Sequence, residues 1–136
     1  MARAENIQAM ERFTDEFWNE KKLDAPDALY AQDATMTPDG PDSPPGPEGM
    51  RHVARFMFAA FPDYHVEIDK IVANDDQVAL RTIHTGTHQG DFMGAPPSGK
   101  QATWTGMTVV RFENGKVVET FWQADLLGLV QQIGGS

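Results

Sequence analysis

Hydrophobic residues recur every three or four positions along the first part of the chain, the spacing that places them on one face of a helix. Between residues 5 and 19 the residues at this spacing are Ile7, Met10 and Phe17, and charged residues fill the opposite face. Proline in a first turn costs little, because the N–H that it lacks has no helical partner there. We therefore predict helices over residues 5–19, over residues 24–30 with Pro26 near the start, and from Gly46-Pro47-Glu48 to the residue before Pro62.

The hydrophobic period changes from about 3.6 to 2 in the second half of the chain, which is typical of strands with one buried face. Val66 and Ile68, for example, alternate with acidic residues. Asn114-Gly115 is a strong hairpin signal, because both residues tolerate the positive φ that a two-residue turn requires. Strands are predicted at residues 33–36, 66–69, 78–88, 103–112 and 116–124, with a short C-terminal tail and with loops rich in proline and glycine at residues 37–49 and 89–100. Helices followed by an antiparallel meander predict an α+β fold.

The composition is that of one globular domain, which we assign to residues 1–136. Hydrophobic residues make up 40% and charged residues 23% of the chain, which is ordinary for a folded protein. The chain has no cysteine, so disulfides, thiolate nucleophiles and thiolate metal sites are excluded. The 20 acidic and 11 basic residues give a net charge of −9, which disfavours binding to nucleic acid or to an anionic membrane surface. Without a signal-peptide pattern or an apolar run of about 20 residues, we expect a soluble cytoplasmic protein.

Three groups of residues in the last two thirds of the chain form a family pattern. They are Gly86-Thr87-His88 with Gly90 and Phe92, then Pro96-Pro97 with Gly99, and then Glu119, Trp122 and Asp125 followed by Leu127, Gln132 and Gly134. With these residues, the segment 46–134 resembles the SnoaL-like polyketide cyclases. The resemblance implies a nuclear-transport-factor-2-like cone, in which a curved antiparallel sheet is packed with N-terminal helices around an internal pocket. It also implies a homodimer formed through the sheet, and chemistry without a metal or organic cofactor.

The resemblance further implies an aspartate that takes a proton from an activated carbon and so starts an intramolecular aldol closure. Asp125 falls on the position of that aspartate. Strand alternation places Asp125 on one face with Glu119, Phe121 and Gln123, and if that face lines the pocket, apolar surroundings should raise the pKa of the carboxyl group. The alternative from the residues alone is that Asp125 caps the helical turn that follows it.

A single aspartate is an insufficient mechanism on energetic grounds. If the carbon acid lies about 5 pKa units above an ordinary aspartate, proton transfer costs about 7 kcal/mol. Raising the pKa of Asp125 by about 2 units recovers under about 3 kcal/mol of this. The remainder requires a hydrogen-bond donor to the enolate oxygen, and the candidates are His84 and Gln123.

His84 and His88 lie on one predicted strand at even spacing and therefore on one face. Their Cα atoms would be about 13 Å apart, too far for both side chains to ligate one metal ion, so we predict no metal site. His84 lies in the middle of the strand, either facing the pocket as a donor or facing outward. For His88, at the strand end, we favour the role of holding the following loop by hydrogen bonds, although it also belongs to the candidate pocket lining.

Aromatic and other large apolar residues supply both the core and any pocket wall. The predicted substrate-binding residues are Phe17, Trp18, Phe61, His88, Phe92, Trp104, Met107 and Phe121. The family often has a histidine near the position of Thr37, where this chain has Thr37-Pro38. We therefore expect one polar pocket contact to be missing, which favours a changed substrate or a function other than cyclisation.

These observations lead to one functional hypothesis and three alternatives. The leading hypothesis is a cofactor-free cyclase that closes a ring in a polyketide-like ester, with Asp125 as base and with His84 and Gln123 at the enolate or carbonyl oxygen. The first alternative is another proton-transfer enzyme on the same fold, namely a dehydratase, isomerase or hydrolase. The second is a non-catalytic protein that binds a small hydrophobic or aromatic ligand, and the third is an interaction domain whose interior is filled by side chains.

Overall fold

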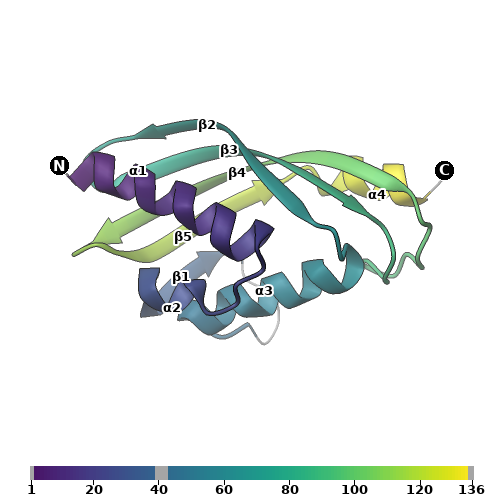
Figure 1. The fold of residues 1–136 in the computed structure, drawn as a ribbon, viewed down its shortest axis with the longest axis horizontal. Coiled ribbons are helices and arrows are strands. Elements are labelled where there is room, and N and C mark those ends of the chain that lie inside the picture. The colour runs from purple at the N-terminus through teal and green to yellow at the C-terminus, as the bar shows by residue number, and fades with distance from the viewer. Residues whose placement is uncertain (1, 39–42, 135–136) are drawn as a thin grey trace.

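The computed structural model describes residues 2–38 and 43–134 (Figure 1). Its elements are α1 (Ala2–Phe13), the π-helical segment η1 (Thr14–Asn19), α2 (Ala25–Leu29), β1 (Tyr30–Thr37), α3 (Gly46–Ala60), β2 (His65–Ala73), β3 (Gln77–Thr87), β4 (Gln101–Glu113), β5 (Lys116–Ala124) and α4 (Leu126–Gly134). Part of the predicted loop at residues 37–49 lies outside the described residues, and its end already belongs to α3.

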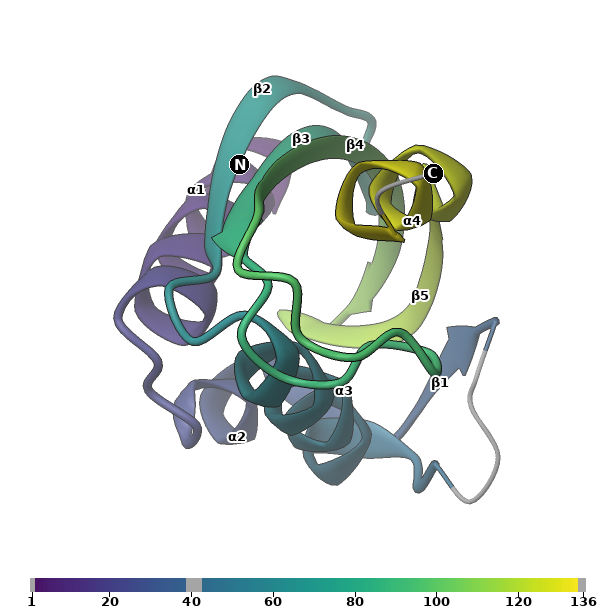
Figure 2. The same ribbon diagram turned by 90° about the vertical axis from the view of Figure 1, so that its right-hand side faces the viewer.

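The five strands form one sheet in the order β1-β5-β4-β3-β2. Figure 2 shows that this sheet curls into an arc, with α1 and α3 across its open side and α4 inside the arc at one end. The predicted α+β fold with a curved sheet is therefore confirmed. The meander β2–β5 is antiparallel as predicted, whereas β1 pairs in parallel with β5.

The turn between β4 and β5 is the predicted two-residue hairpin. Asn114 and Gly115 have φ values of 51° and 78°, and the flanking residues Glu113 and Lys116 are register partners. These positive φ values are the reason that the sequence places asparagine and glycine there.

The first helix differs from a regular α-helix in its last turn and a half. The α-helix ends at Phe13 and the chain continues as η1 to Asn19. The rings of Phe13 and Phe17 are both buried and stack with centroids 4.9 Å apart. At the end of η1, the Asn19 amide donates to the Val66 carbonyl oxygen and accepts from the Val66 N–H, so its side chain pairs with the free edge of β2.

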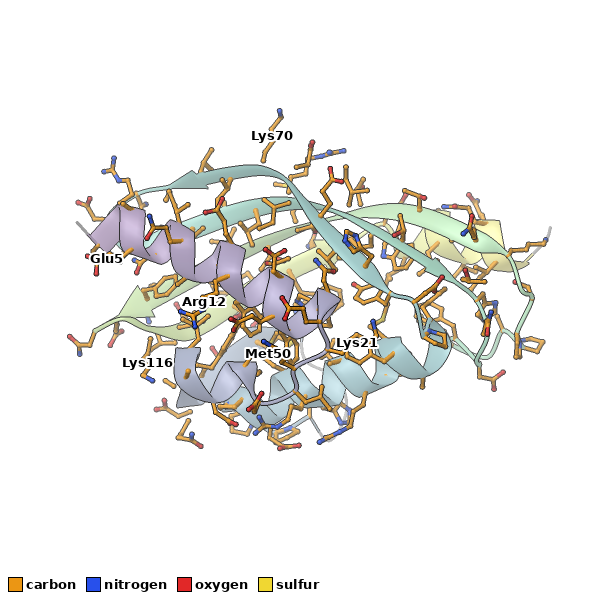
Figure 3. All side chains as sticks on the ribbon, viewed as in Figure 1. Glu5, Arg12, Lys21, Met50, Lys70 and Lys116 are labelled. Atoms are coloured by element: carbon orange, nitrogen blue, oxygen red, sulfur yellow. The ribbon has the colours of Figure 1, made fainter. Side chains whose placement is uncertain are left out.

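Two clusters of buried residues fill the space between the helices and the sheet. The first lies among α1, α3, β1 and one end of the sheet, and Met50 of α3 points into it (Figure 3). Its buried members are Met10, Phe13, Phe17, Tyr30, Ala34, Met50, Ala54, Val78, Leu80, Val110, Phe112 and Val117. The second lies at the other end, under α4, and contains Ala60, Phe61, Tyr64, Val66, Phe92, Ala102, Trp104, Leu129 and Ile133. Among the described residues, no helix combines the length and the apolar character that a membrane span requires.

Candidate functional site

The inner face of the sheet is the face that packs against the helices, and burial identifies it along each strand. In β3 and β4 the buried residues are the even-numbered ones. Between β4 and β5 the register shifts, so that the inner face of β5 continues from Val117 to Thr120, Trp122 and Ala124. Side chains that point to this face form rows across the three strands.

One of these rows consists of small side chains. Thr82 of β3 pairs with Gly106 of β4, which pairs with Ala124 of β5. On one side of this row lies the pair His84–Trp104, and on the other side lies Trp122. A Cβ atom on Gly106 would lie 3.0 Å from His84 Nε2, so glycine at this position lets the imidazole reach across the row.

Both ring nitrogens of His84 make hydrogen bonds. The Tyr64 hydroxyl lies 2.5 Å from Nδ1, and Thr82 Oγ1 lies 2.8 Å from Nε2. Thr82 in turn donates to the Gly106 carbonyl oxygen at 3.3 Å. Because Thr82 uses its proton there, it accepts from Nε2–H, and Nδ1 accepts from the Tyr64 hydroxyl. The chain of bonds therefore fixes the tautomer of His84 with the proton on Nε2.

Burial decides the protonation states of the hydrogen-bonded side chains His84 and Tyr64. Removal from water lowers the pKa of His84 to about 4, because it disfavours the charged imidazolium. The same effect raises the pKa of the Tyr64 hydroxyl. At neutral pH, His84 is thus a neutral imidazole and Tyr64 keeps its proton for the bond to Nδ1.

Aromatic rings hold the imidazole from the side. The ring of His84 lies 5.6 Å from that of Trp104 with an interplanar angle of 11°, and 5.7 Å from the ring of Tyr64 at 27°. This stack, together with the two hydrogen bonds, leaves the imidazole little freedom to rotate. The inner face therefore presents a fixed, neutral N–H donor beside flat aromatic surfaces.

Asp125 lies one residue beyond this row, but its side chain is exposed. Its Oδ1 accepts from the Gly128 N–H at 2.8 Å, and its backbone carbonyl accepts from the Leu129 N–H. Asp125 therefore caps α4, which is the alternative that the residues alone suggested. The expectation of a dry, apolar environment around its carboxylate is wrong, because α4 begins directly after it and turns the side chain toward solvent.

Three further predicted site residues lie on the outer face of the sheet. Met107 and Gln123 are register partners, and Phe121 lies two residues before Gln123 on the same face. Met107 is 53% and Phe121 43% exposed, and Gln123 is exposed as well. Strand alternation correctly grouped Phe121 and Gln123, but their shared face is the convex one, whereas Asp125 lies just beyond the end of β5 in the cap of α4. The expectation that Met107, Phe121 and Gln123 line an internal pocket is therefore wrong.

The remaining predicted lining residues are inside the protein. Phe61, Phe92 and Trp104 belong to the second cluster, Phe17 belongs to the first, and Trp18 packs against both. His88 is fully buried, and its Nδ1 accepts from the Ser98 N–H at 3.2 Å and faces Ser98 Oγ at 3.0 Å. His88 thus holds the loop before β4, as favoured from the sequence.

Tyr64 is the member of the site that sequence reasoning missed. It lies just before β2, outside any periodic pattern, after the Phe61-Pro62-Asp63 turn. The signal that could have found it is the pairing of β2 with β3, because Val66, two residues later, is the register partner of His84.

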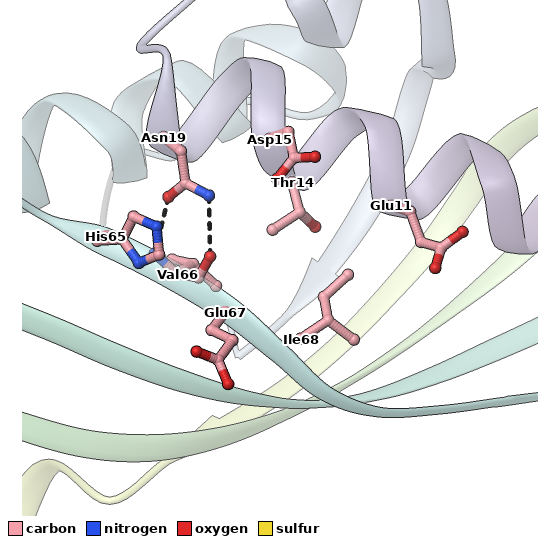
Figure 4. A pocket seen from close by; sticks show the side chains of 8 residues that line it. All are labelled: Glu11, Thr14, Asp15, Asn19, His65, Val66, Glu67 and Ile68. Carbon is pink, nitrogen blue, oxygen red and sulfur yellow. Dashed lines mark hydrogen bonds between the residues drawn. The ribbon is translucent and has the colours of Figure 1, made fainter.

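The described residues enclose at least two cavities. One is an open groove of about 250 Å³ between η1 and β2, beside the Asn19–Val66 pair (Figure 4), and its lining residues are Glu11, Thr14, Asp15, Asn19, His65, Val66, Glu67 and Ile68. None of the site residues predicted from the sequence lines it. The other is a cavity of about 10 Å³ near Tyr30 and Thr120. Within the described part of the chain, no group of three or more His, Asp or Glu residues is arranged to hold a metal ion.

Comparison with known proteins places this fold in a family. Residues 8–133 match the family model described as SnoaL-like polyketide cyclase. The chain is similar to IdmH from Streptomyces antibioticus, proposed to be a polyketide cyclase, with 31% identity over 95% of this chain and 98% of that one and a TM-score of 0.81. It is also similar to TsrD from Streptomyces laurentii, with 26% identity over 100% and 99% of the two chains and a TM-score of 0.89.

A third similar structure is AclR from Streptomyces galilaeus, proposed to be a hydroxylase. It shares 29% identity over 98% of this chain and 83% of that one, with a TM-score of 0.84. No curated protein sequence matches this chain.

Proposed function

Because this chain belongs to the SnoaL-like polyketide cyclase family and is an enzyme, we propose that it catalyses the intramolecular aldol-type ring closure of a polyketide-like ester without a cofactor. The substrate binds against the inner face of the sheet, over the row Thr82–Gly106–Ala124. Its flat, conjugated part packs beside Trp104 and Trp122, which border this row. Similarity to IdmH supports this class of reaction.

The observation that carries the proposal is the hydrogen-bonded chain Tyr64–His84–Thr82. A substrate carbonyl oxygen replaces Thr82 Oγ1 as the acceptor of the His84 Nε2–H. As negative charge develops on that oxygen, a fixed N–H donor in a water-poor site stabilises it without having to reorient. A neutral imidazole can do this without first losing a proton. Tyr64 is the positioning residue, because its hydroxyl keeps the proton of His84 on Nε2.

Asp125 is proposed as the general base. Its Oδ1 is used by the cap of α4, and Oδ2, which accepts no hydrogen bond from the described residues, takes a proton from the substrate carbon that lies between two carbonyl groups. The resulting enolate carbon attacks the second carbonyl carbon and forms the new C–C bond, and the alkoxide oxygen takes back the proton held by Asp125, which gives the hydroxyl and restores the base. Asp125 directly follows Ala124, the β5 member of the row of small side chains, so the base belongs to the segment that borders the proposed substrate site.

The test separates catalysis from capping at Asp125. Asn is as good an N-cap as Asp, so Asp125→Asn keeps the Gly128 bond and removes the base, whereas Asp125→Ala removes both. With a linear aromatic polyketide ester as substrate, we expect Asp125→Asn to lower kcat roughly 10²–10⁴-fold with an unchanged Tm. Asp125→Ala should lose the same activity and also about 1 kcal/mol of stability.

Gln123→Ala is the matched control, because Gln123 lies two residues away on the outer face and should retain full turnover. Wild-type turnover by Asp125→Asn would overturn the assignment of the base.

We further propose that the chain forms a homodimer through the outer face of the sheet. The exposed apolar side chains of Met107 and Phe121 lie there on neighbouring strands, with Val109 between them in register with Phe121. Exposed apolar side chains gathered on one sheet face are a common feature of protein interfaces. This arrangement keeps the dimer contact away from the inner face, on which we propose that the substrate binds.

A further inference from the structure

The segment 86–90 carries the first group of residues in the family pattern, and its two glycines lie against the end of α3. A Cβ atom on Gly86 would lie 2.8 Å from the Cβ of Phe61. A Cβ atom on Gly90 would lie 2.1 Å from the Ala59 carbonyl oxygen. Glycine, which has no side chain, allows contacts this close. The segment 86–90 is therefore shaped to receive the chain as it leaves α3.

Thr87, which lies between these glycines, makes two hydrogen bonds to one carboxylate in the turn that follows α3. Its backbone N–H donates to Asp63 Oδ1 and its hydroxyl donates to Asp63 Oδ2, each at 2.7 Å. These bonds, first of all the one from the N–H, lower the pKa of Asp63 because they favour the ionised carboxylate. At neutral pH the contact is thus a pair of charge-assisted hydrogen bonds, which are stronger than bonds between neutral groups.

Asp63 directly precedes Tyr64, whose hydroxyl lies 2.5 Å from His84 Nδ1 and keeps the histidine proton on Nε2. The register pairs between β2 and β3 begin at His65, directly after Tyr64. Tyr64 therefore has the β2–β3 ladder on one side and the Asp63–Thr87 contact on the other. Both His84 and Thr87 belong to β3, so this contact ties Tyr64 to the same strand that carries the imidazole.

We propose that Asp63 is a further positioning residue of the reaction site, which acts through Tyr64 on the tautomer of His84. Its two bonds to Thr87 set where along β3 the Tyr64 hydroxyl lies, and the neighbouring aromatic rings set the plane of the Tyr64 ring. Without the contact, the hydroxyl moves relative to His84 Nδ1, and the tautomer with the proton on Nε2 is less strongly favoured. The consequence for catalysis rests on the proposed function, whereas the effect on the tautomer does not.

Nitrogen-15 NMR of the His84 side chain tests this inference without a substrate. Asp63→Ala removes both bonds to Thr87, so its His84 nitrogen signals should move part of the way toward those of the Nδ1-protonated tautomer. Asp63→Asn should keep the wild-type signals, because an amide can accept from the Thr87 N–H and donate to the Thr87 hydroxyl. Thr87→Val removes only the hydroxyl bond and should give a smaller movement in the same direction. Wild-type signals in Asp63→Ala would overturn the inference.

Asp69→Ala is the matched control, because the Asp69 side chain also connects β2 to β3. It forms an ion pair with Arg81 at the register shift of β2, away from the turn that carries Tyr64. Asp69→Ala should leave the His84 signals unchanged, even where it lowers Tm. A movement of these signals as large as that in Asp63→Ala would show that a general loosening of the two strands is the cause, which would contradict a specific role of Asp63.

Kinetics with the substrate of the proposed reaction separates this inference from the proposed function. A misplaced group costs turnover more than binding, so Asp63→Ala should lower kcat roughly 10–100-fold with little change in KM. Asp69→Ala should keep wild-type turnover. Moved His84 signals in Asp63→Ala together with a wild-type kcat would support the positioning of His84 by Asp63 and would instead contradict the use of His84 in the reaction.

Discussion

The two faces of β4 and β5 carry different chemistry although their residues alternate along the same strands. The inner face presents a hydrogen-bonded imidazole and buried aromatic rings around Gly106. The outer face presents exposed apolar side chains, the amide of Gln123 and the ion pair between Arg111 and Glu119. Removal from water therefore lowers the pKa of His84 on the inner face, whereas the pKa of Arg111 on the outer face is raised mainly by its hydrogen bonds to Glu119 and Glu113. This difference separates the proposed reaction site from the proposed dimer surface.

The largest expected difference between the faces is in the free energy of unfolding that is lost when an aromatic side chain is replaced by alanine. Trp104 is buried against His84, Tyr64 and Phe61, so Trp104→Ala should cost about 3–5 kcal/mol. Phe121→Ala on the outer face should cost under about 1.5 kcal/mol in the monomer, because 43% of this residue is already exposed. Chemical denaturation of both variants at low protein concentration measures this contrast, and equal losses would remove the distinction between the faces.

The next effect is the pH dependence that His84 creates. Its pKa is about 4 in the folded protein and 6.5 in the unfolded chain, so between these values the unfolded state binds more protons. Stability therefore falls as pH decreases from about 6.5 to about 4, by up to about 3 kcal/mol from this residue. His84→Gln should flatten this part of the stability profile, measured by denaturation at several pH values.

The exposed His65 provides the control for that profile. His65→Gln should follow the wild type across the same range. If His84→Gln and the wild type lost stability in parallel between pH 6.5 and 4, the imidazole would not be buried in its neutral form.

Lysine substitutions on the outer face should have the smallest effect on folding. They should act instead on the assembly of the dimer. Met107→Lys and Phe121→Lys should convert a dimer to a monomer in light scattering, because a lysine on each copy would meet its counterpart across the interface. The stability of the monomer should change by less than about 0.5 kcal/mol. An unchanged dimer in both variants would show that copies associate through another surface.

Sequence periodicity predicted the fold well because it reports which residues alternate and where turns fall. The hairpin at Asn114-Gly115 and the helix that ends before Pro62 are found where the pattern placed them. The parallel pairing of β1 was missed, because a short strand carries no signal for the direction of its partner. The change from α1 to the π-helical segment η1 was also missed, because the hydrophobic spacing of residues 5–19 predicts only a regular helix.

The candidate site was predictable only in part. Alternation showed that Phe121 and Gln123 share a face, but a local pattern does not say which face is concave. That choice depends on the register shift between β4 and β5 and on the helices that cover the sheet. His84 could be proposed from its position in the strand, whereas its partner Tyr64 lies in a non-periodic turn and is brought to it only by the β2–β3 pairing.

The protonation state of His84 tests the central claim most directly, because the proposed reaction needs a neutral imidazole with its proton on Nε2. Nitrogen-15 NMR of the histidine side chains distinguishes the two neutral tautomers and the charged form. We predict that His84 stays neutral and Nε2-protonated from pH 8 down to about pH 5, and that Tyr64→Phe weakens this preference without unfolding the protein. A His84 signal that titrates near pH 6.5, or one with the proton on Nδ1, would contradict the account.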